Sequence, residues 1–330
     1  MRHEGVVLHG TCAATPPAQT PPGPRVMTAS SYAPPSAVNH VFTVDVEEYF
    51  QVNAFDGVIA RSDWDAQRSR VAFGVDHLLD LLARHGVTGT FFVLGWIADR
   101  QPAVVRRIAD AGHEVASHGW SHRRVTTLTR QGLHAELRDS KRLLEDVSGQ
   151  QVLGFRAPSF SITPGFEWAF DVLLEEGYRY DSSLFAVRRP GYGYPGVSEY
   201  PHAIERPAGS IFELPLATVT WCGLRLPAAG GGYFRHFPYA FTRRAFRELT
   251  RRGIPGTFYI HPWELDPDQP RLRVPAATRM RHYGGLRHTS LRLSRLLSQF
   301  RFTSASRLLE SMVSGPGEEP VARLPGTVPA

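Results

Sequence analysis

GHEVASHGWSH, residues 112–122, places two histidines four positions apart directly after a short apolar run. In an extended chain His118 and His122 would stand about 13 Å apart, at ~3.3 Å per residue, which is too far to share an ion. A turn of the chain brings such positions to about 5–6 Å, and Gly119 makes a turn easy. The stretch therefore predicts a strand that ends in a turn carrying two imidazoles.

Two imidazoles suit a zinc ion but do not complete its site, because catalytic zinc usually has three protein ligands and one open position. The pair also has a plain alternative, since a chain with 14 histidines can place two at this spacing on a solvated surface turn. A zinc-protease motif is disfavoured because Gly119 follows the first histidine where that motif needs glutamate. A third ligand must come from elsewhere in the chain.

The composition is that of a globular protein. With 330 residues, 42% of them hydrophobic and 11% aromatic, the chain can bury a large core. The net charge of +6 comes almost entirely from scattered arginines, with Lys141 as the single lysine, so no basic tract predicts nucleic-acid binding. Cys12 and Cys222 form neither a disulfide framework nor a Cys-x-x-Cys metal motif.

The two ends of the sequence differ in composition from the middle. Residues 1–37 are predicted to be a disordered leader and residues 313–330 a disordered tail, which leaves one folded domain over residues 38–312. Met1 and Met27 are alternative starts. No run approaches the ~20 apolar residues of a membrane span, and no signal peptide is recognised. With only two cysteines, we expect a cytoplasmic protein, with peripheral attachment to the inner membrane as an alternative.

Strand and helix patterns alternate through this domain, as apolar runs bounded by turn signals and as apolar residues at helical spacing. Strands are predicted over 40–46, 90–94, 113–117, 152–155, 178–180, 211–219 and 256–260. Helices are predicted over 71–85, 102–109, 130–147, 164–176, 238–252 and 291–299, with a last strand and helix over 300–310. The alternation predicts a parallel sheet, open or closed as a barrel, interrupted by an inserted loop over 186–210.

The candidate polar residues all follow predicted strands. They are Asp45, Glu47 and Glu48 after the first strand, His118 after the third, and Arg156, Asp181 and His261 after later ones. In a β/α barrel, functional residues collect at the carboxyl ends of the strands. The shared position therefore predicts one site.

Asp45 and Glu47 are spaced by two residues, and in an extended segment such residues point the same way. Either acid can therefore be the third metal ligand while the other acts as a base, and the spacing does not separate the two assignments. Glu48 points to the opposite side and is expected to be a solvated carboxylate.

Seven motifs, taken in order, resemble the polysaccharide deacetylase family of the NodB-homology type, a carbohydrate esterase class, and specifically its branch associated with exosortase and exopolysaccharide gene clusters. They are FTVDVEEYFQV (42–52), TFFVLGW (90–96), HEVASHGWSH (113–122), GFRAPSFSI (154–162), YDSSLF (180–185), GGGYFR (230–235) and FYIHPWELD (258–266). The resemblance covers residues 42–302. It implies an α/β fold, a single-domain distorted (β/α) barrel, with a family-specific extension from about residue 215.

The resemblance also implies an activity. A member of this family would be a metal-dependent hydrolase that removes acetyl groups, N-acetyl in the first instance, from a sugar of a bacterial exopolysaccharide or its precursor. The implied cofactor is a divalent metal, zinc in the first instance, with Glu47, His118 and His122 as its ligands. The implied partners are the acetylated saccharide and the exopolysaccharide synthesis machinery, with no nucleic acid.

Four further residues receive catalytic roles from the resemblance. Asp45 is the implied general base, Arg156 holds it, His261 is the general acid, and Asp181 orients His261. The motif YDSSLF lacks the tryptophan that the family often has near this aspartate.

Candidate substrate contacts are Tyr49, Trp120, Pro158, Tyr233, Arg235 and Trp263. The aromatic members can form a sugar-stacking platform or simply belong to the core. The run Gly230–Gly232 is no phosphate loop, because no Lys-Ser/Thr pair follows it and no helix start is marked. Two alternative functions stay open at this point: an amidohydrolase acting on a non-sugar amide, and a catalytically inactive saccharide-binding scaffold.

Overall fold

The computed structural model describes Met1 and residues 38–189, 191–221 and 223–313. The predicted leader and tail lie outside the described residues, apart from Met1 and Val313, as do both cysteines.

A parallel sheet forms the centre of the described structure. Its strands run in the order β10 (Thr257–Ile260), β1 (His40–Val46), β2 (Thr90–Val93), β3 (Glu114–Ser117), β4 (Gly154–Phe155), β5 (Tyr180–Asp181) and β7 (Gly209–Glu213). β6 (His202–Arg206) pairs antiparallel with β7 at one edge, and β11 (Phe302–Thr303) pairs in parallel with β1. β8 (Thr218–Trp221) and β9 (Leu224–Pro227) form a separate hairpin.

The sheet curls until its two ends approach each other. Leu216, which follows β7, forms a parallel bridge with Thr257 of β10, and the Ala217 N–H donates to the Thr257 carbonyl at 3.0 Å. An irregular segment, rather than a regular strand, thus spans the gap between β7 and β10. The prediction of a distorted (β/α) barrel is confirmed.

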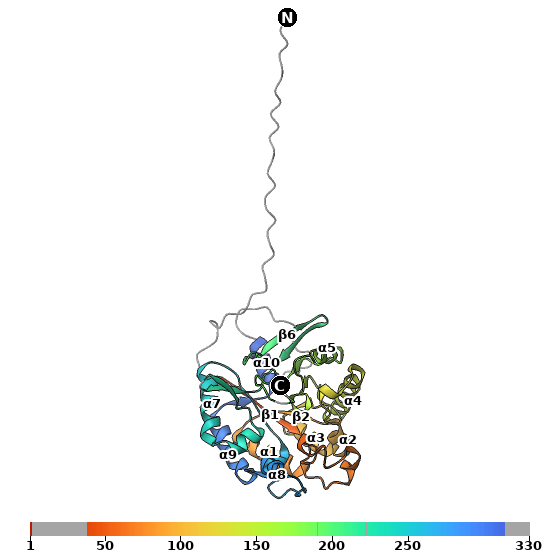
Figure 1. Cartoon of the computed structure of the whole chain (residues 1–330), viewed down its shortest axis with the longest axis vertical. Helices are drawn as coiled ribbons and strands as arrows, with labels where there is room; N and C mark the ends of the chain where they lie inside the picture. Colours follow the sequence, from red (N-terminus) through yellow and green to blue (C-terminus); the bar gives the residue numbers. More distant parts are fainter. Residues whose placement is uncertain (2–37, 190, 222, 314–330) are drawn as a thin grey trace. The chain divides into compact units, whose positions relative to one another are not determined.

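Helices surround the sheet, as Figure 1 shows. They are α1 (Val71–His85), α2 (Gly95–Arg100), α3 (Pro102–Asp110), α4 (Arg130–Ser148), α5 (Trp168–Glu175), α6 (Gly231–His236), α7 (Tyr239–Arg251), α8 (Ala276–Tyr283), α9 (Leu286–Gln299) and α10 (Ala305–Val313). α1 ends as predicted at Gly86, whose φ of 61° lies in the left-handed region that glycine favours. Within the described part of the chain, no helix has the length and apolar character needed to cross a membrane.

The core lies on both faces of the parallel strands. Every residue of β1 is buried, as expected for a strand that helices cover on both sides. Val75, Leu78 and Leu82 recur at helical spacing on α1 and are fully buried. This packing fixes the strands, and therefore the loops that follow them.

His40, at the amino end of β1, is a buried polar residue whose bonds require a neutral ring. Its Nδ1 accepts a hydrogen bond from the Gly256 backbone N–H at 3.0 Å, and its Nε2 lies 3.0 Å from Thr250 Oγ1. Burial lowers the pKa of His40 to about 4. The ring is therefore a structural element at the end of the barrel opposite the carboxyl ends of the strands.

Some local predictions were wrong. α5 begins at Trp168 rather than at Pro164, residues 186–210 contain β6, and residues 211–219 include the end of β7 and the start of β8 with a non-strand segment between them. The glycine run opens α6, although no helix start was expected there. Gly230, at φ 135°, bridges to Tyr259 of β10, and a Cβ there would clash with the Tyr259 carbonyl. The close contact between the backbones of Gly230 and Tyr259 determines the conformation of the glycine run, and residue types alone do not reveal such a contact.

Candidate active site

The carboxyl ends of β10, β1 and β3 open into one cavity of about 500 Å³. The chemically active side chains on its wall are Asp45, Glu47, His118, His122 and His261. They come from motifs far apart in the sequence. The predicted convergence of strand ends at one site is therefore present in the structure.

The turn that carries the two histidines is held by its backbone. Gly119 has φ 75° and His122 has φ 53°. A positive φ in a non-glycine residue is strained and persists only where the surroundings impose it. Glu136 of α4 imposes it here, since its Oε2 accepts from two backbone N–H groups of the turn at 2.7 and 2.8 Å. The turn points both imidazoles toward the end of β1.

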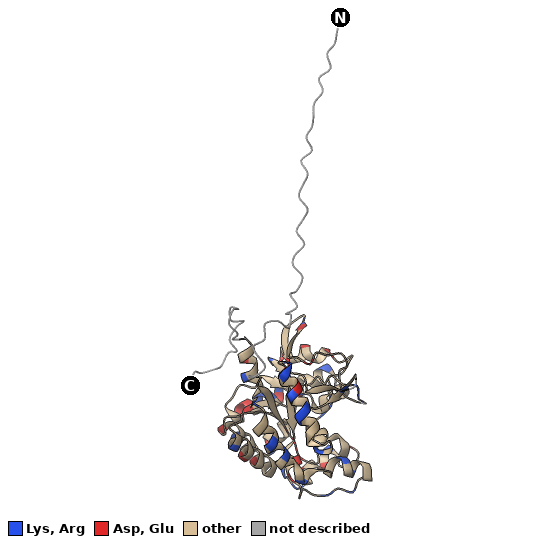
Figure 2. Cartoon of the chain, turned by 90° about the vertical axis from the view of Figure 1, so that its left-hand side faces the viewer, with Lys and Arg blue, Asp and Glu red and all other residues tan. Residues whose placement is uncertain are grey.

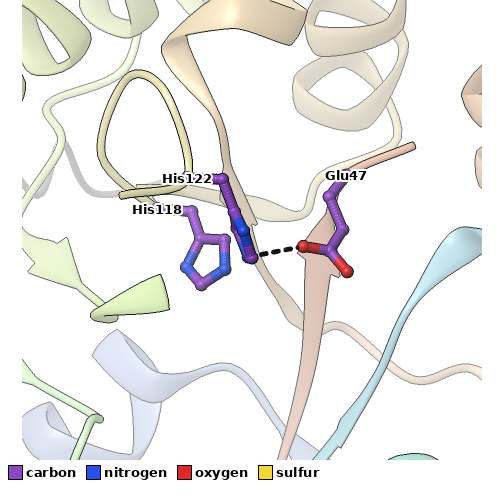
Figure 3. A group of neighbouring side chains, drawn as sticks. All are labelled: Glu47, His118 and His122. Atoms are coloured by element: carbon purple, nitrogen blue, oxygen red, sulfur yellow. Dashed lines mark ion pairs between the residues drawn. The ribbon is translucent and has the colours of Figure 1, made fainter. Parts of the chain in front are cut away.

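Glu47, His118 and His122 form a cluster that suits a divalent metal (Figure 3). Each residue offers one ligand atom, and these atoms lie within 4.8 Å of one another. Glu47 Oε2 lies 2.7 Å from His122 Nε2, yet this buried oxygen has no aligned hydrogen-bond partner among the described residues. Two imidazoles and a carboxylate are a ligand set that zinc accepts.

The protonation states of this cluster also suit a cation. His118 Nδ1 lies 2.8 Å from the Arg156 carbonyl, so this nitrogen carries the proton and Nε2 keeps its lone pair. Burial lowers the pKa of His118 to about 4. Burial alone would raise the pKa of Glu47, but the charges of His122 and His261 lower it to about 2. Metal ligands must be deprotonated, and these two groups are.

Asp45 is buried and fixed by one arginine. Arg156 Nη1 donates to Asp45 Oδ1 at 2.7 Å and to Thr43 Oγ1 at 2.7 Å. The other side of the guanidinium donates to Ser182, from Nε to the carbonyl at 2.9 Å and from Nη2 to Oγ at 2.8 Å. Arg156 has no solvent exposure. A charge-assisted bond to a rigid guanidinium therefore sets the orientation of this carboxylate.

His261 is held by Glu264, a residue that was not predicted to have a role. Glu264 Oε1 lies 2.7 Å from His261 Nδ1 and also accepts from the His261 backbone N–H at 3.1 Å. His261 Nε2 is then left 3.6 Å from Glu47 Oε1. Burial alone would lower the pKa of His261, but the carboxylates of Glu47 and Glu264 raise it to about 9. A cation bound at Glu47 would remove part of that attraction.

Arg235 supports Glu264 and is not the predicted substrate contact. Its Nε donates to Glu264 Oε2 at 2.5 Å, and its Nη1 and Nη2 donate to the carbonyls of His282 and Arg281 at 2.9 and 3.1 Å. The side chain is only 2% exposed. Its donors are therefore occupied by the protein, although the residue lines the cavity.

Trp263 is also placed differently from the prediction of a sugar-stacking residue. Its ring lies between two others, 5.1 Å from the His261 ring and 4.3 Å from the His282 ring, both nearly parallel to it. Neither face is open to a sugar. Its Nε1 instead donates to Glu47 Oε1 at 3.2 Å, which orients the carboxylate of the metal cluster.

Two segments of the chain match known protein families, and the whole barrel resembles a solved structure. Residues 65–171 match the family model described as polysaccharide deacetylase, and residues 182–310 match a domain of unknown function, DUF3473. A solved structure assigned to the polysaccharide deacetylases of Mycobacterium smegmatis superposes with a TM-score of 0.57 at 23% identity, covering 88% of this chain and 94% of that one. Residues 65–171 are a polysaccharide deacetylase domain. The barrel as a whole shares its fold with the Mycobacterium smegmatis structure.

Curated relatives of the polysaccharide deacetylase domain match only parts of the chain. The peptidoglycan deacetylase of Helicobacter pylori is 31% identical over 34% of this chain and 37% of that protein. The peptidoglycan-N-acetylglucosamine deacetylase of Listeria monocytogenes is 30% identical over 38% of this chain and 28% of that protein. The chain thus spans about a third of the length of these relatives.

Asp181, which lies outside both matched segments, does not reach the position that the resemblance implies. Its Oδ1 and Oδ2 accept from Ser183 Oγ and N at 2.7 and 3.0 Å, and it stands opposite Glu213 in the β5–β7 register. Burial raises the pKa values of both carboxyl groups. Glu264, not Asp181, orients His261. The His-Pro-Trp-Glu spacing is the sequence signal that could have revealed this, because an acid three residues after a helix cap can bond back to it.

The remaining substrate candidates divide into two groups. Tyr49 is 1% exposed and packs edge-on against Phe50, and buried Pro158 likewise is not on the cavity wall. Trp120 packs over Gly95, where a Cβ would clash with its ring. Of these four residues, Tyr233 is the one that lines the cavity, and its hydroxyl lies 2.6 Å from that of Tyr192, another wall residue.

Glu48 is buried rather than solvated. Its carboxylate accepts from the backbone N–H groups of Arg70 and Val71 at 2.9 and 3.3 Å, and from the Ser69 hydroxyl. These groups stand at the start of α1, where the first N–H groups of a helix lack partners. The neighbour of the candidate metal ligand is thus the cap of a helix.

Proposed function

We propose that the chain is a metal-dependent hydrolase that removes N-acetyl groups from a sugar of a bacterial exopolysaccharide or of its precursor. The observation that carries the proposal is the convergence, on one cavity wall, of a His–His–Glu cluster, an arginine-bound aspartate and a third histidine. The names of the relatives supply the reaction, since they are described as deacetylases of peptidoglycan. The exopolysaccharide assignment follows the motif pattern of the sequence.

In this proposal Glu47, His118 and His122 hold zinc. Zinc in such a site lowers the pKa of bound water towards ~7 and polarises a carbonyl group. The swapped assignment, with Asp45 as ligand and Glu47 as base, is disfavoured because Asp45 is bonded to Arg156 while Glu47 lies against His122.

The other residues move and hold protons. Asp45 takes the proton from the attacking water, and Arg156 holds that carboxylate in place. His261, with Nδ1 bound to Glu264, directs Nε2 into the cavity and gives a proton to the departing amine. Glu264 prevents the imidazole ring from turning away. Arg235 keeps the Glu264 carboxylate in position.

The location belongs to the proposal as well. A deacetylase that acts on a precursor would meet its substrate in the cytoplasm, at the inner membrane or beside the synthesis machinery. Finding the native protein in the periplasmic fraction would contradict this part of the proposal and leave the chemistry intact.

The test measures metal and acetate separately on the purified chain. We expect about one zinc per chain in the wild type, lost in His118→Ala and in Glu47→Ala. Asp45→Asn is the matched control: it should keep zinc and lose acetate release by ~10²–10⁴-fold on N-acetylated oligosaccharides. A wild-type chain that binds no divalent metal when supplied with one would refute the mechanism. Loss of zinc in Asp45→Asn would instead support the swapped ligand assignment.

Two competing functions are separated by the same measurements. An amidohydrolase of non-sugar amides would bind zinc and release no acetate from saccharides. The fold does not exclude it, since an allantoinase structure superposes with a TM-score of 0.56 at 17% identity and shares the barrel alone. An inactive scaffold would bind saccharide without releasing acetate, and it would have no need of a base and an acid beside a metal cluster.

A further inference from the structure

Arg124 is a cavity residue that the proposed reaction does not use. It follows the histidine turn by two positions and is half-buried on the cavity wall. Asn53, from the loop after β1, fixes it: with its amide oxygen facing the guanidinium, Asn53 accepts from Arg124 Nε and Nη2 at 3.0 and 3.2 Å. The same oxygen contacts the Ser159 hydroxyl. A neutral amide orients the guanidinium but does not balance its charge.

On the facing wall, a glycine lies opposite this guanidinium. Gly191, at φ 81°, lines the same cavity, and a Cβ there would stand 3.5 Å from Arg124 Nη1. A larger residue at this position would reach over the guanidinium. The wall therefore leaves room beside Arg124 for a group that is not part of the protein.

The charges around the cavity are unequal. Its two carboxylates are engaged, Asp45 with Arg156 and Glu47 within the metal cluster. Of its three arginines, Arg235 is paired with Glu264, whereas Arg124 and Arg281 have no carboxylate within 4.0 Å among the described residues. In the view of Figure 2, basic and acidic segments are interspersed along the ribbon. Two of the three arginines that line the cavity thus carry charge that no carboxylate of the described residues balances.

Resting on the proposed function, we propose that the saccharide substrate is anionic and that its carboxylate or phosphate pairs with Arg124. The planar guanidinium fork matches both anions with two parallel hydrogen bonds. A neutral sugar that covered Arg124 would remove water from a charge without replacing it, which disfavours binding. An anionic sugar restores the lost interactions, so the cavity selects it. Arg281, exposed at the same cavity, adds attraction over a longer distance.

The test compares three N-acetylated probes by isothermal titration of the zinc-loaded full chain. They are chitohexaose, which is neutral, a hyaluronan hexasaccharide, which carries carboxylates, and N-acetylglucosamine 1-phosphate. We expect one of the anionic probes to bind at least tenfold more tightly than chitohexaose, and which of them does so identifies the anion. Arg124→Gln should weaken binding of that probe by roughly tenfold to a hundredfold, the cost of a charge-assisted hydrogen bond, and should not weaken binding of chitohexaose.

Arg106→Gln is the matched control, because it removes the same charge from an exposed position on α3 outside the cavity wall. It should change neither affinity. Equal losses in the two variants would show a net-charge effect and overturn the proposal, as would wild-type binding of chitohexaose as tight as that of the tighter anionic probe. The zinc content of Arg124→Gln verifies that the variant is folded.

Acetate release, measured on the same preparations, separates this inference from the proposed function. Release from chitohexaose with no preference for anionic probes would overturn the anionic specificity and leave the deacetylase proposal standing. Binding of none of the three probes, together with no acetate release, would overturn both.

Discussion

Replacing Glu264 by glutamine tests the support behind the candidate acid. Glu264 has no solvent exposure, and its two oxygens face only donors: the backbone N–H and Nδ1 of His261 on one side, and Nε of Arg235 on the other. Glutamine keeps the size of the side chain but must turn an NH₂ group toward one of these donors. It also leaves the buried guanidinium of Arg235 without its counter-charge.

The expected cost follows from the burial of the pair. Removing one partner of a buried ion pair costs about 3–5 kcal/mol, whereas replacing both by uncharged groups is often nearly neutral. Glu264→Gln and Arg235→Met should therefore each lower the free energy of unfolding by roughly 3–5 kcal/mol. The double variant should be more stable than the sum of the two losses predicts, with a coupling energy of up to about 3 kcal/mol.

The assay is urea denaturation of the four proteins, with zinc content and acetate release measured on each. Zinc should be retained in all four, because neither residue belongs to the His–His–Glu cluster. Acetate release should fall in kcat rather than in KM, since His261 loses the carboxylate that holds its ring. Additive losses of stability, or an unchanged kcat in Glu264→Gln, would refute the role given to this pair.

Two further predictions concern the metal cluster and the pH dependence of stability. Trp263→Phe keeps a ring between the two histidines but removes the N–H that holds Glu47 Oε1. The zinc affinity should therefore fall by ~10–100-fold with little change in fold. Chelator competition measures this affinity, and an unchanged value would contradict the prediction. His40 has a folded pKa of about 4 against 6.5 unfolded, so its contribution to stability is present above pH 6.5 and is lost as the pH falls towards 4. Urea denaturation should show about 2 kcal/mol less stability at pH 5 than at pH 7 from this residue, and His40→Gln should remove that part of the slope; an equal slope in both proteins would show that other groups titrate.

The parts of the fold that were predicted correctly are those that depend on local sequence patterns. β1 has the predicted bounds, α1 ends at the predicted glycine, and the strand-end position of the polar residues brought the histidine turn next to Glu47. The periodicity of hydrophobic residues and the residue preferences of turns both act over a few residues, so they can be read directly from the sequence. The spacing of two between Asp45 and Glu47 likewise placed both carboxylates on the cavity wall.

The residues that hold the site in place could not be predicted from the sequence, because their contacts join residues that are distant in sequence. Arg235 was expected to contact substrate, and nothing in its neighbourhood shows that its partner lies at position 264. Trp263 was expected to stack on a sugar, since residue type does not tell which faces of a ring are covered. Asp181 matched its motif by order alone, and its carboxylate is used by Ser183 in the next turn.

The turn over Pro262–Leu265 explains how these supports are connected. Trp263 in it binds Glu47, and Glu264 in it binds His261, so one turn orients both the metal cluster and the candidate acid. The turn rests on α1, where Gly74 has no room for a Cβ beside the Pro262 carbonyl. The start of α1 is in turn capped by Glu48, the residue next to Glu47. A shift of α1 would therefore move the metal cluster from two directions, through the turn and through the end of β1, which is a physical reason for a helix on the outside of the barrel to be packed so closely against its active end.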